Sequence, residues 1–268
     1  MDNYMIDIQN EHDTREIPLQ KVGVKNVLYP VSVLDKANKT QQTHATVDLF
    51  VNLPHHYKGT HMSRFIETFH KHSNDISMKN FHVMLEELRQ KLDAERAYGL
   101  VKFPFFMEKE APVSKLKGML CYTCSYEGAV ELVENQLQKD FFVTIEVPIT
   151  SLCPCSKAIS NYGAHNQRGL VTVKVRNTHF FWIEDIIMLV EKCASSELYS
   201  MLKRQDEKFV TERAYDNPRF VEDIVREVYT ALQQFDDKNP FDYFSVEAEN
   251  YESIHTHNAY AFTEFYRN

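Results

Sequence analysis

The sequence alternates between two side-chain periodicities, and the order of the two constrains the fold more than any other feature. Residues 42–52 alternate apolar and polar side chains, which is typical of a half-buried strand. Residues 26–34 are its predicted partner, with Pro30 favouring an edge or a bulge. Apolar stripes at helical spacing follow at 62–69 and 81–92, and strand patterns return at 100–107 and 116–126. The first half is therefore predicted as strand, strand, helix, helix, strand, strand.

The second half repeats this order without visible sequence similarity to the first. Strands are predicted at 141–149 and 170–175, helices at 182–202 and 220–232, and final strands at 241–248 and 257–265. Pro218 lies just before the second of these helices, and proline is favoured where a helix begins. We therefore expect an α+β protein with helices layered on antiparallel sheets, and a repeat of architecture. Its predicted parts are a tail (1–21) and two modules (22–133 and 134–268).

Composition narrows the class of protein. The chain has 268 residues, 43% of them hydrophobic, which is enough to bury a core and argues against disorder. No apolar run approaches the roughly 18 residues of a membrane span, and the first 20 residues are polar and acidic, so a cytoplasmic protein is expected. The formal charge of -8 argues against nonspecific nucleic-acid binding. Five cysteines, an odd number, favour free thiols or metal ligands over a disulfide framework.

The densest group of reactive side chains lies in residues 151–169, between two predicted strands. Cys153, Cys155 and His165 offer two thiols and an imidazole, ligands that zinc and similar ions favour. Their spacing matches no zinc-finger pattern, so a metal site competes here with a simpler interpretation. In that interpretation the thiols are small buried side chains, and the histidine bonds to backbone.

Three further groups have both a structural and a functional interpretation. The charged segments 204–212 and 218–223 are by default solvated, and acidic residues near a helix N-terminus suit its dipole. His255 and His257 are expected on one face of a strand, where both imidazoles converge on one site. Residues 59–63 open a helix that Thr60 or Ser63 caps, with His61 available to a ligand.

The pair Cys121 and Cys124 has the spacing of a metal or redox motif. On a strand, however, residues three apart point to opposite faces, which argues against a joint site. We therefore expect these two cysteines, with Cys193, in the core.

Several blocks of this sequence resemble the type IB GTP cyclohydrolases, over a region from about Val22 to the end of the chain. The blocks are Gly59-Thr-His-Met-Ser-Arg64, Ser151-Leu-Cys-Pro-Cys-Ser-Lys157, Tyr162-Gly-Ala-His-Asn-Gln-Arg168, Val210-Thr-Glu212 and Pro218-Arg-Phe-Val-Glu-Asp223. The resemblance implies a tandem tunnelling fold of two ββααββ modules. It also implies a homotetramer whose sheets close into barrels, with active sites at subunit interfaces.

The resemblance also implies roles for single residues. It implies Cys153, His165 and Glu207 as ligands of a divalent metal ion, and the carboxylate in this set lets manganese or iron compete with zinc. Glu222 corresponds to the residue that anchors guanine, since one carboxylate accepts hydrogen bonds from the ring N–H and the exocyclic amine together. The resemblance also implies proton transfer by His255 and His257. The triphosphate needs cations, for which Lys157, Arg168, Arg64 and Lys58 are candidates by their proximity in sequence, and His61 is a further candidate for substrate binding. The role of Cys155 stays open.

The implied reaction opens the imidazole ring of GTP at C8 with metal-activated water, releases formate and recloses the product as 7,8-dihydroneopterin triphosphate, at the start of the folate and queuosine pathways. Two enzymes of the same fold are alternatives. One is a deazaguanine nitrile reductase with a cysteine nucleophile and a nicotinamide cofactor, and the other is an archaeal-type cyclohydrolase with a cyclic phosphate product. A third alternative is a binding protein in which a metal has a structural role only; such sites usually have four protein ligands.

Overall fold

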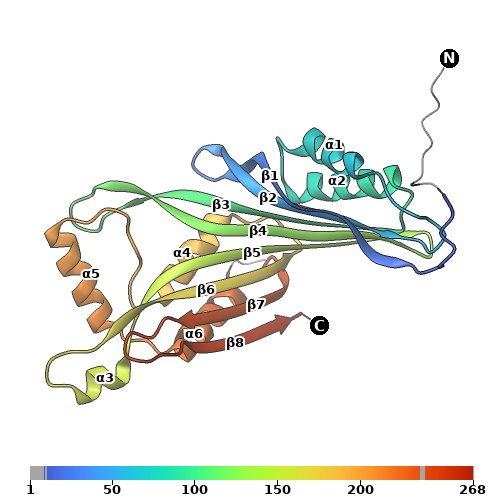
Figure 1. The fold of residues 1–268 in the computed structure, drawn as a ribbon. Helices are drawn as coiled ribbons and strands as arrows, with labels where there is room; N and C mark the ends of the chain where they lie inside the picture. Colours follow the sequence, from blue (N-terminus) through green and yellow to red (C-terminus); the bar gives the residue numbers. More distant parts are fainter. Residues whose placement is uncertain (1–8, 10, 236–238, 268) are drawn as a thin grey trace. The chain divides into compact units, whose positions relative to one another are not determined.

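The computed structural model describes residues 9, 11–235 and 239–267, and Figure 1 shows the course of the chain. Of the predicted tail, residues 1–8 and 10 lie outside the described part. The elements in chain order are β1 (Leu19–Asp35), β2 (Lys39–Leu53), α1 (Met62–His72), α2 (Met78–Lys91), β3 (Arg96–Glu110), β4 (Lys117–Val133), β5 (Gln136–Leu152), α3 (Pro154–Ile159), β6 (Asn166–Asn177), α4 (Ile183–Cys193), α5 (Arg204–Asp216), α6 (Val221–Gln233), β7 (Phe241–Asn250) and β8 (Ala259–Tyr266). No helix among them is long and apolar enough to cross a membrane.

The strands form an antiparallel sheet in which each strand neighbours the next along the chain, from β1 to β8. Two compact units divide the chain: unit 1 comprises Met1–Phe103 and Ser125–Phe142, and unit 2 comprises Pro104–Cys124 and Val143–Asn268. The long strands β3, β4 and β5 each contribute residues to both units, and the division into two modules at residue 133 stays a prediction. The α+β class and the antiparallel pairing are as predicted.

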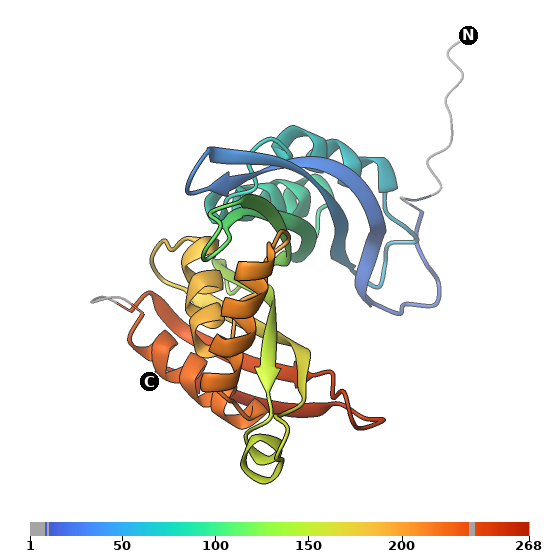
Figure 2. The same cartoon turned by 90° about the vertical axis from the view of Figure 1, so that its left-hand side faces the viewer.

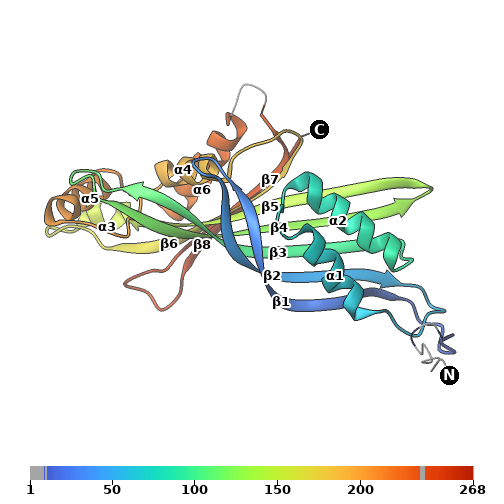
Figure 3. The ribbon, with the colours of Figure 1, turned by 90° about the horizontal axis from the view of Figure 1, so that it is seen from above.

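Unit 1 is built from the helices α1 and α2 and the strands that they cover. Figure 3 shows the two helices side by side over these strands. Phe65 and Phe69 of α1 and Phe81 and Leu85 of α2 are buried, as the two apolar stripes predict. In the hairpin of β1 and β2, Pro30 lies on the terminal strand of the sheet order, which confirms its predicted edge position.

Unit 2 contains nearly all the residues that the sequence marks as functional. Its strands pair in simple registers, such as Ile145 with Val173 and Val246 with Thr263, and α4 and α6 lie on one face (Figure 2). The buried face of α6 includes Ile224 and Val228, which are fully buried. Burial of such side chains contributes about 1.5–3 kcal/mol each, so α6 is firmly held.

The helix predicted at 182–202 is shorter in the structure. α4 ends at Cys193, and the chain then runs alongside β5, where Ser195 N donates to Thr150 O (3.1 Å) and Thr150 N to Ser196 O (3.2 Å). Leu198 and Met201 continue the helical spacing by chance, so the periodicity overestimated the length of this helix. The hydrogen bonds to β5 replace those that a longer helix makes, and they hold the segment next to the strand that ends at the cysteine motif.

The helix α5 was not predicted, because it has almost no apolar face. Of its residues only Asp206 and Ala214 are buried. The Asp206 carboxylate accepts hydrogen bonds from the backbone N–H groups of Val113 (2.9 Å), Ser114 (2.8 Å) and Lys203 (2.8 Å). Burial alone raises the pKa of Asp206, but hydrogen bonds from Ser114, Lys203 and Val113 outweigh burial and lower it well below its usual range. Hydrogen bonds, rather than hydrophobic burial, therefore fix the start of α5.

A buried ion pair ties α4 to the strands β3 and β4. Lys109 Nζ and Tyr122 Oη both donate to Glu191 Oε1, each at 2.8 Å, and Lys109 Nζ also donates to Leu198 O at 3.1 Å. The side chains of Lys109 and Glu191 are only 11% and 4% exposed. Burial raises the pKa of Glu191, against the opposing effect of Lys109.

Lys109→Met is expected to lower the free energy of unfolding at neutral pH by about 3–5 kcal/mol, because it leaves the Glu191 carboxylate buried without its cation. A raised pKa means that the folded state binds the proton more tightly. The contribution of Glu191 to stability is therefore fully present at low pH and is lost as pH rises through the folded pKa. The difference in free energy of unfolding between Lys109→Met and the wild type should accordingly be smaller when urea denaturation is repeated at acidic pH. Lys117→Met removes the exposed pair with Glu108 and should change stability by less than about 1 kcal/mol; an equal loss in both variants would contradict this account.

Candidate active site

Cys153 lies where β5 ends and the short helix α3 begins. It is the N-cap residue, and Pro154 occupies the first turn, where its missing N–H costs nothing. Ser156 N donates to Cys153 Sγ (3.4 Å), and Ser156 Oγ donates to Cys153 O (3.2 Å). The thiol is half-buried and held by its own helical turn, whereas Cys155 is exposed.

His165 lies next to this turn although it is distant in sequence. Gly163 has φ of +121°, a conformation that side chains strongly disfavour, and it lets the chain return toward Cys153. Cys153 N donates to His165 O (3.1 Å), and His165 N donates to Ser156 Oγ (3.2 Å). The two predicted ligands, Cys153 and His165, are therefore neighbours, and their backbones are directly hydrogen-bonded to each other.

One edge of the His165 ring is already engaged. His165 Nδ1 lies 2.9 Å from Gln167 Oε1 and 3.3 Å from Ser253 Oγ. Nε2 has no hydrogen-bond partner among the described residues and is therefore the nitrogen available to a ligand. A thiolate and an imidazole nitrogen fit a zinc-like ion in donor chemistry.

The third predicted ligand, Glu207, is not part of this group. It is exposed in the first turn of α5, and within the described part of the chain no three His, Cys, Asp or Glu side chains are grouped closely enough to hold a metal ion. One chain therefore supplies two donors that fit a metal ion, while the ligand role of Glu207 remains a prediction.

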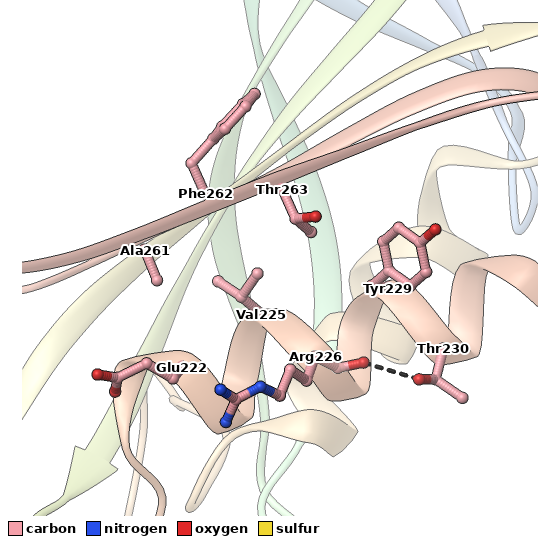
Figure 4. Close-up of a pocket in the computed structure, with 8 residues that line it drawn as sticks. All are labelled: Glu222, Val225, Arg226, Tyr229, Thr230, Ala261, Phe262 and Thr263. Carbon is pink, nitrogen blue, oxygen red and sulfur yellow. Dashed lines mark hydrogen bonds between the residues drawn. The ribbon is translucent and has the colours of Figure 1, made fainter.

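Glu222 lies in the first turn of α6 and lines a pocket between α6 and β8, shown in Figure 4. The pocket has a volume of about 370 Å³, and its lining residues are Glu222, Val225, Arg226, Tyr229, Thr230, Ala261, Phe262 and Thr263. Ala261 and Thr263 point toward α6, and Phe262 points to the other side of β8. Glu222 is exposed, with no hydrogen bond or ion pair among the described residues, so its carboxylate is available to a ligand.

The neighbouring carboxylate, Asp223, has a different task. Its Oδ2 accepts a hydrogen bond from Phe220 N (3.1 Å), which satisfies a backbone donor at the start of α6, and its Oδ1 lies 3.7 Å from Arg226 Nη1. The structure therefore separates two acidic residues that the sequence leaves similar: Asp223 caps the helix, and Glu222 faces the pocket.

The two predicted proton-transfer histidines lie together, but the strand prediction for them was wrong. The segment before β8 is a bend rather than a strand, and β8 begins only at Ala259. His255 and His257 are nevertheless stacked, with ring centroids 5.1 Å apart and an interplanar angle of 20°, and both are exposed. Ser253 and Glu252 of the same segment reach the Cys153–His165 site through His165 and Gln167.

The predicted substrate-binding residues lie on different elements and have different contacts. Lys157 Nζ donates to Tyr215 O and lies 4.3 Å from the centroid of the Tyr215 ring, so Lys157 connects α3 to α5. The Arg168 side chain is exposed on β6, next to Gln167. His61 is the N-cap residue of α1, with no side-chain capping bond, so neither Thr60 nor Ser63 caps this helix as predicted. His61 belongs to unit 1, as do the further triphosphate candidates Lys58 and Arg64, and the other predicted site residues belong to unit 2.

Of the three other cysteines, which were all predicted in the core, two are buried and one is exposed. Cys124 and Cys193 are buried, as expected, whereas Cys121 is exposed on the opposite face of β4, so its assignment to the core was wrong. Burial raises the pKa of both Cys124 and Cys193, which keeps them as inert thiols.

Sequence reasoning missed the polar residues behind the site, namely Ser151, Gln167 and Asn250. Each is at least 92% buried and hydrogen-bonded within unit 2. A single sequence gives little signal for them, because a buried serine or amide on an alternating strand resembles its solvent-facing counterparts. The only hint was that Ser151 and Gln167 fall on positions of the alternation that the neighbouring apolar residues mark as inward-facing.

Comparison with solved structures identifies the fold. A hyperthermostable mutant of urate oxidase from Bacillus sp. TB-90 matches with a TM-score of 0.56 at 7% identity, covering 92% of this chain and 98% of the other. Urate oxidase from Bacillus subtilis 168 matches with a TM-score of 0.52 at 7% identity, covering 92% and 99%. At such identities the likeness concerns the fold alone, and it confirms the predicted tunnelling fold.

Comparison with known sequences identifies the family. The family model described as Type I GTP cyclohydrolase folE2 matches residues 5–261. A protein of Syntrophus aciditrophicus named GTP cyclohydrolase FolE2 is 54% identical over 97% of this chain and 99% of its own length. The protein of the same name from Geobacter sulfurreducens is 53% identical, covering 97% and 98%. This chain belongs to the type I GTP cyclohydrolase FolE2 family.

Proposed function

We propose that this protein is a metal-dependent GTP cyclohydrolase that converts GTP and water to 7,8-dihydroneopterin triphosphate and formate. GTP cyclohydrolase activity, and with it a hydrolase role in folate biosynthesis, follows from identity of about 50% to proteins of that name over nearly the whole chain. One structural observation carries the proposal: Cys153 and His165 lie next to each other, because Cys153 N donates a hydrogen bond to His165 O. The product also serves as a precursor for queuosine in our proposal.

Cys153 Sγ and His165 Nε2 are the proposed ligands of a divalent zinc, manganese or iron ion. When bound, such an ion acts as a Lewis acid and makes a water nucleophilic near neutral pH. The Ser156 N–H that donates to Cys153 Sγ holds the proposed ligand atom in place. Glu207 is the proposed third ligand. Because one chain does not bring it to the pair, this assignment requires assembly of subunits.

Glu222 is the proposed guanine anchor. An ionised carboxylate only accepts hydrogen bonds, and guanine offers two adjacent donors, the ring N1–H and the exocyclic amine. Adenine lacks the N1 proton, so this contact selects guanine. The neighbouring pocket has apolar wall atoms from Val225 and Ala261 that suit a flat base.

His255 and His257 are the proposed proton-transfer groups. Ring opening and release of formate need several proton transfers near one carbon, and imidazole accepts and donates protons near neutral pH. Their segment joins β7 to β8 and hydrogen-bonds to His165 through Ser253, which supports a place beside the ligand pair. Arg168 and Lys157 are the proposed contacts to the triphosphate, with His61 as a further substrate-binding residue.

We propose further that the chain assembles as a homotetramer with active sites at its interfaces, in the cytoplasm, where free thiols persist. The terminal strands β1 and β8 each have one neighbour in the sheet order, and Tyr260, Phe262 and Tyr266 of β8 are more than half exposed. Unpaired sheet edges with exposed aromatic residues favour pairing with another chain. Light scattering should give a mass close to four times the 31.5 kDa of one chain. A fully active monomer would rule out a site completed by assembly.

The activity is tested by incubating the protein with GTP and zinc, manganese or iron, followed by oxidation and detection of pterin fluorescence. We expect a fluorescent pterin in the presence of metal and none after chelation. Mass spectrometry of the product separates the triphosphate from a cyclic phosphate. Failure to form any pterin with all three metals would reject the proposal, and nicotinamide-dependent nitrile reduction in its place would indicate the reductase of the same fold.

A further inference from the structure

Behind His165, on the side away from Nε2, lies a chain of buried polar side chains. Gln167 is 8% exposed, and its Oε1 is 2.9 Å from His165 Nδ1. Its Nε2 is 3.4 Å from both Ser151 Oγ and Glu252 Oε1. An amide so well buried on a strand normally costs stability unless both of its ends are hydrogen-bonded, and here both ends are.

Two contacts fix which end of the Gln167 side-chain amide faces His165. Glu252 Oε1 is a carboxylate oxygen, which accepts hydrogen bonds, so it faces the NH2 group of Gln167. Ser151 has one proton, which it donates to Arg219 O at 3.1 Å. Its oxygen therefore accepts from Gln167 and from Asn250 Nδ2, the latter at 3.1 Å. Both contacts turn the carbonyl of Gln167 toward His165.

A carbonyl oxygen facing His165 Nδ1 requires a proton on that nitrogen. In neutral imidazole the other nitrogen, Nε2, then carries the lone pair. We propose that Gln167 is a positioning residue: by accepting from Nδ1–H, it fixes the tautomer and ring orientation of His165, so that Nε2 is presented as a metal ligand. This inference rests on the proposed function, in which His165 binds the metal.

The same polar chain reaches the start of α6. Ser151 Oγ bonds to Arg219 O, and Arg219 N donates to Leu152 O (3.0 Å), so the residues just before Glu222 are fixed to the end of β5. Gly169 permits this arrangement, because a Cβ there would stand 2.6 Å from Asn250 Oδ1. Ser151 therefore connects the segment that orients the metal ligand with the segment that precedes the guanine anchor.

The first test leaves Gln167 and its hydrogen bonds unchanged. In metal-free protein labelled with 15N-histidine, long-range proton–nitrogen correlation spectra report the tautomer of each ring, and His165→Gln assigns the His165 signals. We expect the Nδ1–H tautomer for His165. The Nε2–H tautomer, or an equal mixture of the two, would overturn the proposal whether or not the protein binds a metal.

The second test is Gln167→Met, which keeps the length of the side chain and removes its hydrogen bonds. We expect loss of the tautomer preference and zinc binding weaker by about 10–100-fold, measured by competition with a chromophoric chelator. Gln167→Glu retains an acceptor and should retain the Nδ1–H tautomer. Gln138→Met, at an exposed glutamine of β5, is the matched control and should bind zinc as the wild type does.

The outcomes separate this inference from the proposed function. Wild-type zinc affinity in folded Gln167→Met would overturn the positioning role. A wild-type protein that binds zinc and shows the Nδ1–H tautomer, yet forms no pterin from GTP, would reject the proposed function and leave the role of Gln167 intact.

Discussion

Cys153→Ser is expected to lower kcat/KM for GTP by at least about 1,000-fold, since loss of Lewis-acid activation of water removes several kcal/mol of transition-state stabilisation. Serine keeps the volume of the side chain and its place at the N-cap of α3, but its hydroxyl does not ionise to replace the thiolate as a ligand. The fold should remain, because Cys153 is only half-buried and α3 contributes no buried residues. Steady-state kinetics and metal content by mass spectrometry measure the two effects.

Two matched substitutions control this experiment. Cys121→Ser changes an exposed cysteine on β4 and should leave activity and metal content unchanged. Cys155→Ser changes the neighbouring exposed thiol and separates a ligand role from a general requirement for the motif. If Cys153→Ser kept full activity and metal content, the ligand assignment of Cys153 would be wrong.

Glu222→Gln is expected to weaken GTP binding by about 100-fold, because one charge-assisted hydrogen bond is lost and the new amide NH2 opposes a guanine donor. Discrimination against ATP should fall at the same time, since guanine loses its advantage. Calorimetric titration of GTP and ATP into the Cys153→Ser protein, with and without Glu222→Gln, measures affinity without turnover.

Asp223→Asn is the matched control for Glu222, because it alters the adjacent carboxylate. Asp223 accepts from Phe220 N, so its substitution should lower stability modestly through the helix cap and leave GTP affinity near that of the parent. Should Asp223→Asn weaken GTP binding while Glu222→Gln does not, the two roles would have to be exchanged.

The sequence could predict the elements whose side chains are sorted by burial. The apolar spacing of Ile224, Val228 and Leu232 predicts α6, and the alternation from Phe141 to Ile149 predicts β5, because each element has one buried face. The apolar pattern does not predict α5, because this helix is held by the hydrogen bonds of Asp206 and has no apolar period.

The site was predictable to a similar extent. The motif identifies Cys153 and His165, and the structure brings them together through Gly163 and Ser156. His255 and His257 lie together, but in a bend rather than on the predicted strand. The polar residues behind the site depend on contacts between strands that no local pattern encodes, as Gln167 between Ser151 and Glu252 illustrates. Glu207 depends on surfaces outside one chain in our proposal, so neither the sequence nor the structure of one chain tests it.

The central claim is that this protein opens the imidazole ring of GTP and releases C8 as formate. Carbon NMR of [8-13C]GTP, incubated with the manganese-, zinc- or iron-loaded protein, follows that carbon directly. We predict that the labelled C8 signal is replaced by labelled formate in proportion to the pterin formed, and that Cys153→Ser prevents it. Labelled carbon retained in the purine with every metal, under conditions in which the protein is folded and binds GTP, would contradict the claim.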